Sequence, residues 1–213
     1  MVVMDDYEWA DLVDDQDKVR MLADPTSTYA QAAGAAMGRA MDDVVIAALI
    51  GSSSTGTSGT TSTALPAAQK IVHGSAGLTI AKLISAKKIL DEGDVDPSIK
   101  RWIAVAPEQI EDLLNNTTVT SSDFNTVKSL AQGEINSFVG FEFIVTNRLT
   151  SDGTSRQCIA WAQDGFTLAV GKDMSSRIDE RADKSYSTQV YCSMTIGGTR
   201  MEEEKVVEIA CNE

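Results

Sequence analysis

The first clear hydrophobic pattern along the chain is helical. From Tyr29 to Ile50 the sequence is rich in Ala and Met and contains no proline. Apolar residues recur there at spacings of three and four, which places them on one helix face: Met37, Met41, Val44, Val45 and Ala48. Asp24, Thr26 or Ser27 can cap the start, and Gly51 ends the run. The pattern predicts one long helix of about 24 residues, roughly 36 Å.

The next segment interrupts this pattern. Gly51 to Thr63 contains only Gly, Ser and Thr, which cannot bury apolar area. We expect a mobile loop here that separates two structural units.

The pattern beyond Pro66 predicts short alternating elements. A helix over Leu78–Leu90 is expected to stop at Asp91-Glu92-Gly93. A buried strand over 101–106 should lead into a helix over 108–114, with Pro107 at the first helical turn, where proline is tolerated. A further helix is predicted from Ser122-Asp123 to Ala131.

Strand patterns dominate the last third of the chain. Residues 141–146 alternate like a strand, Asp152-Gly153 fits a tight turn, and 157–162 is the expected partner strand. The remaining predictions are a short helix over 166–171, strands over 177–181, 186–196 and 205–210, and a turn at Gly197-Gly198. The fold class is therefore α+β, with strands concentrated in the C-terminal half.

Residues 1–24 form an acidic arm. Lys18 and Arg20 oppose eight carboxylates, a net charge of −6: Asp5, Asp6, Glu8, Asp11, Asp14, Asp15, Asp17 and Asp24. The arm also holds Trp9 and several other apolar residues, too many for a purely solvating tail. We expect an extended segment that lies on a partner.

Composition narrows the possible functions. The 213 residues carry a formal net charge of −13, which argues against a protein whose main task is to grip nucleic acid. His73 is the single histidine, which removes most metal-site and general-base chemistry. Three widely spaced cysteines indicate reduced thiols of a cytosolic protein. The longest apolar stretch, 44–50, is too short for a membrane span, and no secretory signal is evident.

Three segments partly resemble catalytic or binding motifs. The run from Gly51 to Ser58 has the spacing of a phosphate loop, but Thr57 replaces the lysine, so a flexible loop is the better interpretation. Asp15-Gln16-Asp17 begins like a calcium loop that the following residues do not complete; a loosely bound divalent cation stays the alternative to a solvated acidic face. His73–Gly77 lacks a nucleophile elbow, and we interpret it as a turn. We therefore predict no catalytic, cofactor-binding or metal-binding residues.

A charged segment near the C-terminus is the candidate interface. Positive and negative residues alternate there: Arg177, Asp179, Glu180, Arg181, Asp183 and Lys184. In a self-associating protein this arrangement fits reciprocal pairing between identical subunits, whereas the alternative is an ordinary exposed strand edge. Trp9 of the acidic arm joins this candidate interface.

Several segments in serial order resemble the major capsid (coat) proteins of tailed bacteriophages. After the long helix, the Gly/Ser loop and the next helix, they are 101–109 (RWIAVAPEQ), 140–147 (GFEFIVTN), 158–173 (CIAWAQDGFTLAVGKD), and 177–181 (RIDER) leading into 186–191. Together the resemblance covers most of residues 25–211. It implies the fold of the Hong Kong ninety-seven phage coat.

The resemblance also implies a division of the chain. Residues 1–24 would be an acidic arm or the remnant of an extended loop. Residues 25–65 would supply the spine helix and Gly/Ser loop of a peripheral domain, 66–160 an axial domain, and 161–213 return strands to the peripheral domain. Family members usually carry an N-terminal arm and a complete extended loop before the spine, and this chain supplies very little before Asp24.

The function that follows is structural. The chain would be a subunit that self-assembles into pentamers and hexamers around the phage genome, in a virion capsid assembled in the host bacterial cytoplasm. Expected partners are the protein itself, a scaffolding protein and a portal, with packaged DNA only as a neighbour, and with no membrane, small-molecule substrate or cofactor. The alternatives are a nanocompartment shell protein of the same fold, or a small acidic enzyme or binding module.

Overall fold

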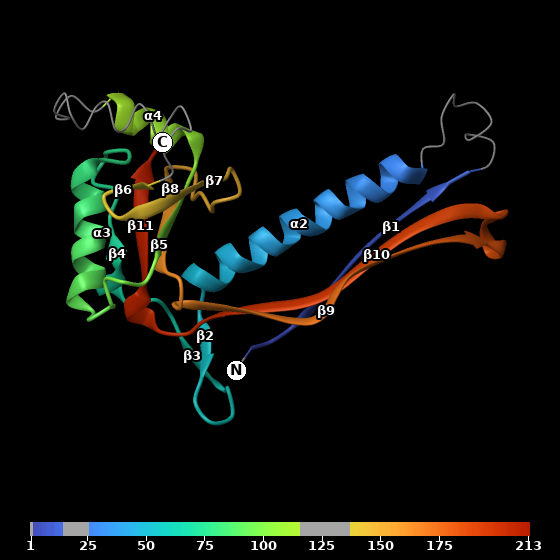
Figure 1. Cartoon of the computed structure of the whole chain (residues 1–213), viewed down its shortest axis with the longest axis horizontal. Coiled ribbons are helices and arrows are strands. Elements are labelled where there is room, and N and C mark those ends of the chain that lie inside the picture. Colours follow the sequence, from blue (N-terminus) through green and yellow to red (C-terminus); the bar gives the residue numbers. More distant parts are fainter. Residues whose placement is uncertain (1, 15–25, 116–136) are drawn as a thin grey trace. The chain divides into compact units, whose positions relative to one another are not determined.

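The computed structural model describes residues 2–14, 26–115 and 137–213, which form two compact units (Figure 1). The three-stranded unit comprises Val2–Val45 and Leu168–Gly198. The six-stranded unit comprises Ile46–Thr167 and Thr199–Glu213. The predicted helix between 122 and 131, and the acidic residues from Asp15 to Asp24, lie outside the described residues.

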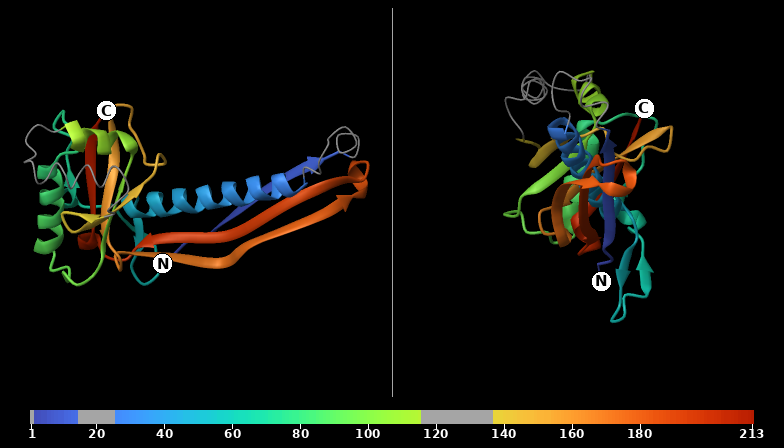
Figure 2. Two further views of the ribbon diagram at one scale, coloured as in Figure 1. Left: turned by 45° about the horizontal axis from the view of Figure 1, so that its top comes forward. Right: turned by 90° about the vertical axis from the view of Figure 1, so that its right-hand side faces the viewer.

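The three-stranded unit is a helix on a long antiparallel sheet. Its strands are β1 (Asp5–Val13), β10 (Ser187–Arg200) and β9 (Phe166–Arg181), in the order β1-β10-β9. Helix α2 (Thr26–Ile50) runs along this sheet (Figures 1 and 2), as the periodicity predicted. The arm is thus extended as expected, but β1 finds its partner in its own chain, where Asp5 faces Ile196 and Val13 faces Thr188.

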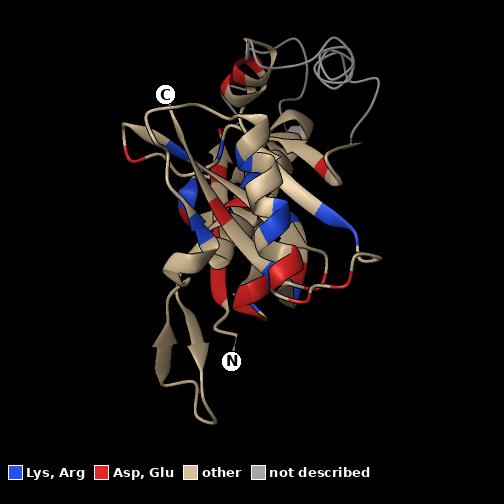
Figure 3. Cartoon of the chain, turned by 90° about the vertical axis from the view of Figure 1, so that its left-hand side faces the viewer, with Lys and Arg blue, Asp and Glu red and all other residues tan. Residues whose placement is uncertain are grey.

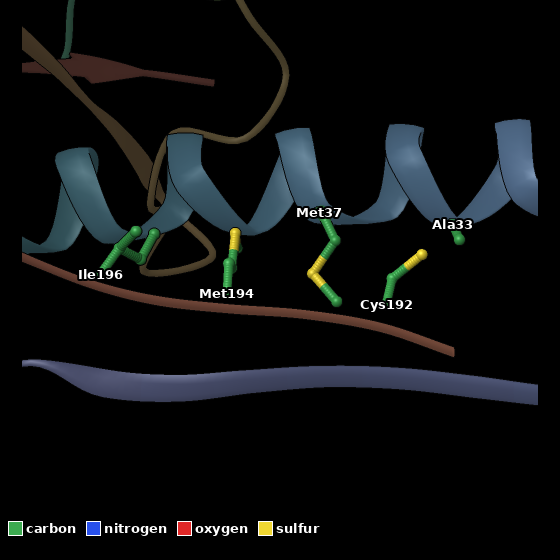
Figure 4. Packing of buried hydrophobic residues seen from close by; sticks show 5 residues of the cluster. All are labelled: Ala33, Met37, Cys192, Met194 and Ile196. Carbon is green, nitrogen blue, oxygen red and sulfur yellow. The ribbon is translucent and has the colours of Figure 1, made fainter. Parts of the chain in front are cut away.

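The core of this unit lies between α2 and β10. Ala33 and Met37 of the helix contact Cys192, Met194 and Ile196 of the strand, and all five are buried (Figure 4). The helix residues are four apart and the strand residues two apart, so each set faces the other element. Partly buried apolar residues pack around this cluster: Tyr7, Trp9, Ala40, Met41 and Val44.

The six-stranded unit is a mixed sheet with the order β4-β11-β8-β5-β7-β6. The strands are β4 (Lys70–Ile71), β5 (Arg101–Val105), β6 (Ser137–Phe138), β7 (Phe141–Val145), β8 (Ser155–Ala162) and β11 (Val206–Asn212). The pairs β5–β7 and β4–β11 are parallel and the others antiparallel. Three short 3-10 turns complete the connections: η1 (Ala67–Gln69), η2 (Ala182–Lys184) and η3 (Glu203–Lys205).

Two helices accompany this sheet. Helix α3 (Ile80–Glu92) packs against β11 and β4, and its buried residues Leu83, Ala86 and Leu90 recur at helical spacing. The side chain of Thr79 caps its start by accepting a hydrogen bond from the Lys82 amide, at 3.3 Å. Helix α4 (Pro107–Asn115) follows β5 directly, so the predicted strand-then-helix order is confirmed.

One strand pairing predicted from the sequence is wrong. Residues 141–146 and 157–162 do form strands, β7 and β8, but β5 lies between them in the sheet. The segment that contains the Asp152-Gly153 turn therefore crosses a strand, and β8 pairs with β5 and β11 instead. Hydrophobic alternation identifies strands but carries no information about which neighbour each one chooses.

A predicted helix and a predicted turn are also wrong, because both segments lie inside long strands. The expected short helix over 166–171 is the start of β9, and Gly197-Gly198 continues β10 instead of turning. A Cβ added to Gly197 would collide with the carbonyl oxygen of Val3. Gly197 therefore allows the backbone before β1 to approach β10 closely, and such a close approach is a common reason for glycine within a strand.

The Gly/Ser/Thr segment forms a hairpin rather than a loop. Strands β2 (Ser53–Thr55) and β3 (Thr61–Thr63) pair antiparallel, and the Thr55 and Thr63 hydroxyls lie 2.9 Å apart. Gly56 and Gly59 adopt positive φ angles of 84° and 64°, which a side chain would disfavour. The hairpin carries no charged side chain, as Figure 3 shows.

Candidate assembly surface

Strand β1 is held by polar contacts on one face of its sheet. The Tyr191 hydroxyl donates a hydrogen bond to Glu8 at 2.8 Å, and the Thr195 hydroxyl donates one to Asp6 at 2.6 Å. The hydrogen bond to Glu8 raises the pKa of Tyr191, since the phenol would lose this bond on ionising. Two carboxylates of the arm therefore accept hydrogen bonds from their own chain, which the net charge of the arm did not predict.

Trp9 lies on the opposite face of β1. It stands directly across from Cys192, is half-buried, and packs against the cluster under α2. The structure thus gives Trp9 a contact within its own chain, and its role between subunits stays a prediction.

The charged tip, which we define as Arg177–Lys184, brings the other candidate residues together. Four of them lie at the C-terminal end of strand β9 and two lie in η2. All six are exposed: Arg177, Asp179, Glu180, Arg181, Asp183 and Lys184. Arg181 binds Asp183 through two parallel contacts of 2.7 Å and donates to Gln189 at 3.0 Å. The hydrogen bonds from Arg181 lower the pKa of Asp183 to about 2.

The chain reversal at the charged tip is defined by its own hydrogen bonds. Ser185 and Tyr186 adopt positive φ angles of 53° and 62°, and the Tyr186 amide donates to the Arg181 carbonyl at 3.0 Å. The Ser187 hydroxyl lies 2.6 Å from both the Lys184 carbonyl and a carboxylate oxygen of Asp14. The tip therefore has a defined backbone that presents charged side chains to solvent.

Two cations that sequence reasoning missed, one half-buried and one buried, hold the six-stranded unit together. The Lys82 ammonium lies within hydrogen-bond distance of four carbonyl oxygens, those of His73, Ala76, Gly77 and Ala210, at 2.7 to 3.0 Å. It thereby ties the turn before α3 to strand β11. Burial lowers the pKa of Lys82, while the nearby thiols and Asp112 act in the opposite direction.

Arg200 performs the same task at the base of the hairpin. Its guanidinium is buried and donates to the carbonyls of Leu49 and Gly51 at 2.9 and 2.8 Å, and to that of Thr63 at 3.3 Å. The first two acceptors belong to the end of α2, where backbone carbonyls lack helical partners. Because the acceptors of Lys82 and Arg200 are backbone atoms, no residue motif could have signalled either contact.

Two of the segments that partly resemble catalytic or binding motifs lie in a turn and a hairpin of the described residues and form no reactive cluster there. His73 accepts a hydrogen bond from the Ser75 amide at 3.1 Å, within a turn, and the phosphate-loop-like residues lie in the β2–β3 hairpin. Among the described residues, no three His, Cys, Asp or Glu side chains converge as a metal site, and all three cysteines are buried and free. Within the same ranges, no helix has the length and apolar character needed to cross a membrane.

Comparisons with known proteins complete this description. The family model for phage capsid proteins matches residues 1–213, whereas no curated protein matches the sequence. A structure from Mycobacterium phage Che8 is 20% identical with a TM-score of 0.70, over 96% of this chain and 70% of that one. The capsid structure of cyanophage P-SCSP1u is 18% identical with a TM-score of 0.75, over 100% of this chain and 74% of that one. The capsid structure of Ralstonia phage GP4 is 12% identical with a TM-score of 0.74, over 99% of this chain and 74% of that one.

These matches agree with one long helix early in the chain, with strands mostly in the C-terminal half, and with the predicted resemblance to coat proteins. The fold is of the Hong Kong ninety-seven type, and the chain acts as a structural shell subunit that self-associates, not as an enzyme. The chain thus belongs to the phage capsid protein family.

Proposed function

We propose that the subunit assembles into pentamers and hexamers that close around the phage genome. The observation that carries this proposal is the family match over the whole chain, together with an exposed charged tip at the end of two long strands. A scaffolding protein and a portal are the expected assembly partners, and packaged DNA is a neighbour rather than a ligand, since the net charge of −13 repels phosphates. Assembly would take place in the host bacterial cytoplasm.

The domain roles follow from the same proposal. Residues 25–65 act as the spine and hairpin of a peripheral domain, 66–160 as the axial domain, and 161–213 as the strands that return to the peripheral domain. The inclusion of Leu168–Gly198 in one compact unit with Val2–Val45 supports a return of the chain after the axial segment, whereas Thr199–Glu213 belongs to the six-stranded unit.

The charged tip, with Trp9, is the proposed contact between subunits. Its six charged residues are exposed and of both signs, so identical copies can pair reciprocally. Arg181 and Asp183 already pair within one chain, which leaves Arg177, Asp179, Glu180 and Lys184 as the residues of the tip that can pair across an interface.

Charge reversal tests this contact. We expect Arg177→Glu to reduce the yield of closed shells, measured by sedimentation and electron microscopy, because it replaces an attractive pair by a repulsive one. Lys88→Glu is the matched control, since Lys88 is an exposed lysine on α3 with only a surface pair to Glu92. Normal shell yield with a folded Arg177→Glu protein would contradict the interface, and a purified protein that forms neither rings nor shells would contradict the assembly itself.

A further inference from the structure

Tyr186 is an exposed aromatic residue in the chain reversal that follows the charged tip. Its side chain is 64% exposed, whereas every other aromatic residue within 2–14, 26–115 and 137–213 is buried or half-buried. Tyr191 of β10, for example, is half-buried and donates its hydroxyl proton to Glu8. A solvated aromatic side chain leaves about 150 to 250 Å² of possible burial unused. Such a residue is typical of a contact surface, where tyrosine is enriched.

The backbone at Tyr186 is unfavourable for a tyrosine. Ser185 and Tyr186 have φ angles of 53° and 62°, in the left-handed region where glycine and asparagine are the usual residues. A bulky side chain at such an angle is uncommon, because its Cβ crowds the backbone. Strained residues of this kind cluster at functional sites. A contact made by the ring therefore explains the tyrosine better than the geometry of the turn does.

Hydrogen bonds on both sides of Tyr186 fix its backbone. The Tyr186 amide donates to the Arg181 carbonyl at 3.0 Å, and the Ser187 hydroxyl donates to the Lys184 carbonyl at 2.6 Å. The ring is thus presented from a closed turn, and a tyrosine has only two χ angles to restrict when it is buried. Preorganisation of this kind raises affinity, because little conformational freedom is lost on binding.

The charge of the tip favours a second copy of the chain as the partner. Residues 177–184 carry three positive and three negative side chains, so the rest of the chain holds the whole net charge of −13. Contacts elsewhere on the surface bring like charges together, whereas two tips can meet without net repulsion. A strongly cationic partner would find more complementary surface outside the tip. The mixed signs also allow identical copies to pair reciprocally.

We propose that the Tyr186 ring is the anchor of the contact between the charged tips of neighbouring copies. The ring is buried at the centre of this contact, and the charged side chains surround it and exclude water. Exposed ion pairs at the rim contribute little free energy and mainly fix the orientation of the two copies. The inference rests on the shell function, since it assigns the residue that dominates one contact between subunits.

Three substitutions separate the ring from the conformation of the turn. Tyr186→Asn removes the ring and suits the positive φ, so its melting midpoint should equal or exceed that of the wild type. Its yield of shells, assembled from purified protein alone, should fall at least about tenfold, as for loss of a hot spot. Tyr186→Phe keeps the ring and should assemble within about twofold of the wild type. Ser185→Asn is the matched control, because it suits the neighbouring positive φ, keeps the ring, and should leave the yield unchanged.

Hydroxyl-radical footprinting reads the contact directly in the unsubstituted chain. Mass spectrometry should show that Tyr186 is oxidised in free subunits and protected in assembled protein. Equal oxidation of Tyr186 in the two states would overturn the inference, because a buried anchor must lose access to solvent.

The outcomes separate the anchor from the shell function. Normal shell yield from folded Tyr186→Asn overturns the anchor and leaves the shell function standing, and so does an equal loss in Tyr186→Asn and Ser185→Asn. Small oligomers of the wild type that never close into shells, and that Tyr186→Asn abolishes, support the anchor and count against the shell. A wild type that stays monomeric overturns both. If purified Tyr186→Asn assembles normally and fails only beside other phage proteins, the ring binds one of those proteins, which overturns the contact between copies.

Discussion

Removal of the Lys82 ammonium should destabilise the six-stranded unit substantially. In Lys82→Met the apolar stem is largely retained, but four carbonyl oxygens lose their common donor. The acceptors come from the turn before α3 and from β11, and the most distant acceptor, the Ala210 carbonyl, is 128 residues from Lys82 in the sequence. The variant therefore releases a long-range tie as well as individual hydrogen bonds.

The magnitude follows from the number of protons. The ammonium can donate three charge-assisted hydrogen bonds, and each contributes about 1.5 to 3 kcal/mol to stability. Because the site is partly exposed, their sum is an upper limit, and we expect the free energy of unfolding to fall by about 3 to 5 kcal/mol. For a chain of this size that loss corresponds to roughly 10 °C in the melting midpoint. Lys82→Gln, which keeps two donors, should fall between the wild type and Lys82→Met.

The assay is thermal or urea unfolding followed by tryptophan fluorescence. Two of the three tryptophans, Trp102 and Trp161, belong to the six-stranded unit, and a Trp9→Phe background removes the third. Lys88→Met is the control, because Lys88 lies on the same helix with a surface pair at 3.4 Å and should change stability by less than about 0.5 kcal/mol. If Lys82→Met unfolds at the same midpoint as Lys88→Met, the four carbonyl contacts do not stabilise the fold as argued.

Three further predictions concern the three-stranded unit. Gly197→Ala should detach the chain before β1, because the new Cβ would collide with the Val3 carbonyl; hydrogen exchange should then show lost protection in β1, and full protection would refute the close approach. Met37→Ala should cost about 2 to 4 kcal/mol, since Met37 is 3% exposed in the core; a loss below about 1 kcal/mol by denaturation would contradict that packing. The folded-state pKa of Asp183 is depressed, so its contribution is present above the unfolded value of 3.8 and is lost as pH falls through about 2; NMR titration should show that midpoint, and Arg181→Ala should return it toward 3.8.

The elements of the fold were largely predictable because they depend on local patterns. The long helix, the helix over 78–90, and the strand followed by the Pro107 helix each carry their own periodicity and end signals. The failures involve information that is not local. The insertion of β5 between β7 and β8, and the straight passage of β10 through Gly197-Gly198, depend on contacts with distant segments.

The candidate surface shows the same division. Alternating charges identified the charged tip correctly as an exposed segment, because six charged residues in eight cannot be buried at an acceptable cost. Exposure does not reveal that Arg181 pairs with Asp183 in its own chain, since that depends on the backbone reversal at Ser185 and Tyr186. Residue type thus predicted that the charged tip is exposed. The backbone reversal at Ser185 and Tyr186 determines which of its charged side chains pair within the chain and which can contact a second copy.

The distribution of charge inside and outside the fold explains how a strongly acidic chain can still form a shell. Lys82 and Arg200 are directed at backbone carbonyls and neutralise no carboxylate through those contacts, so the acidic excess stays on the surface. Assembly must then overcome repulsion among identical subunits, which salt screens over about 10 Å at 0.1 M. Shell yield should therefore rise between low and moderate salt if the contacts between copies are mostly apolar or hydrogen-bonded. A fall in yield over the same range would instead mean that ion pairs such as those of the charged tip dominate the interface.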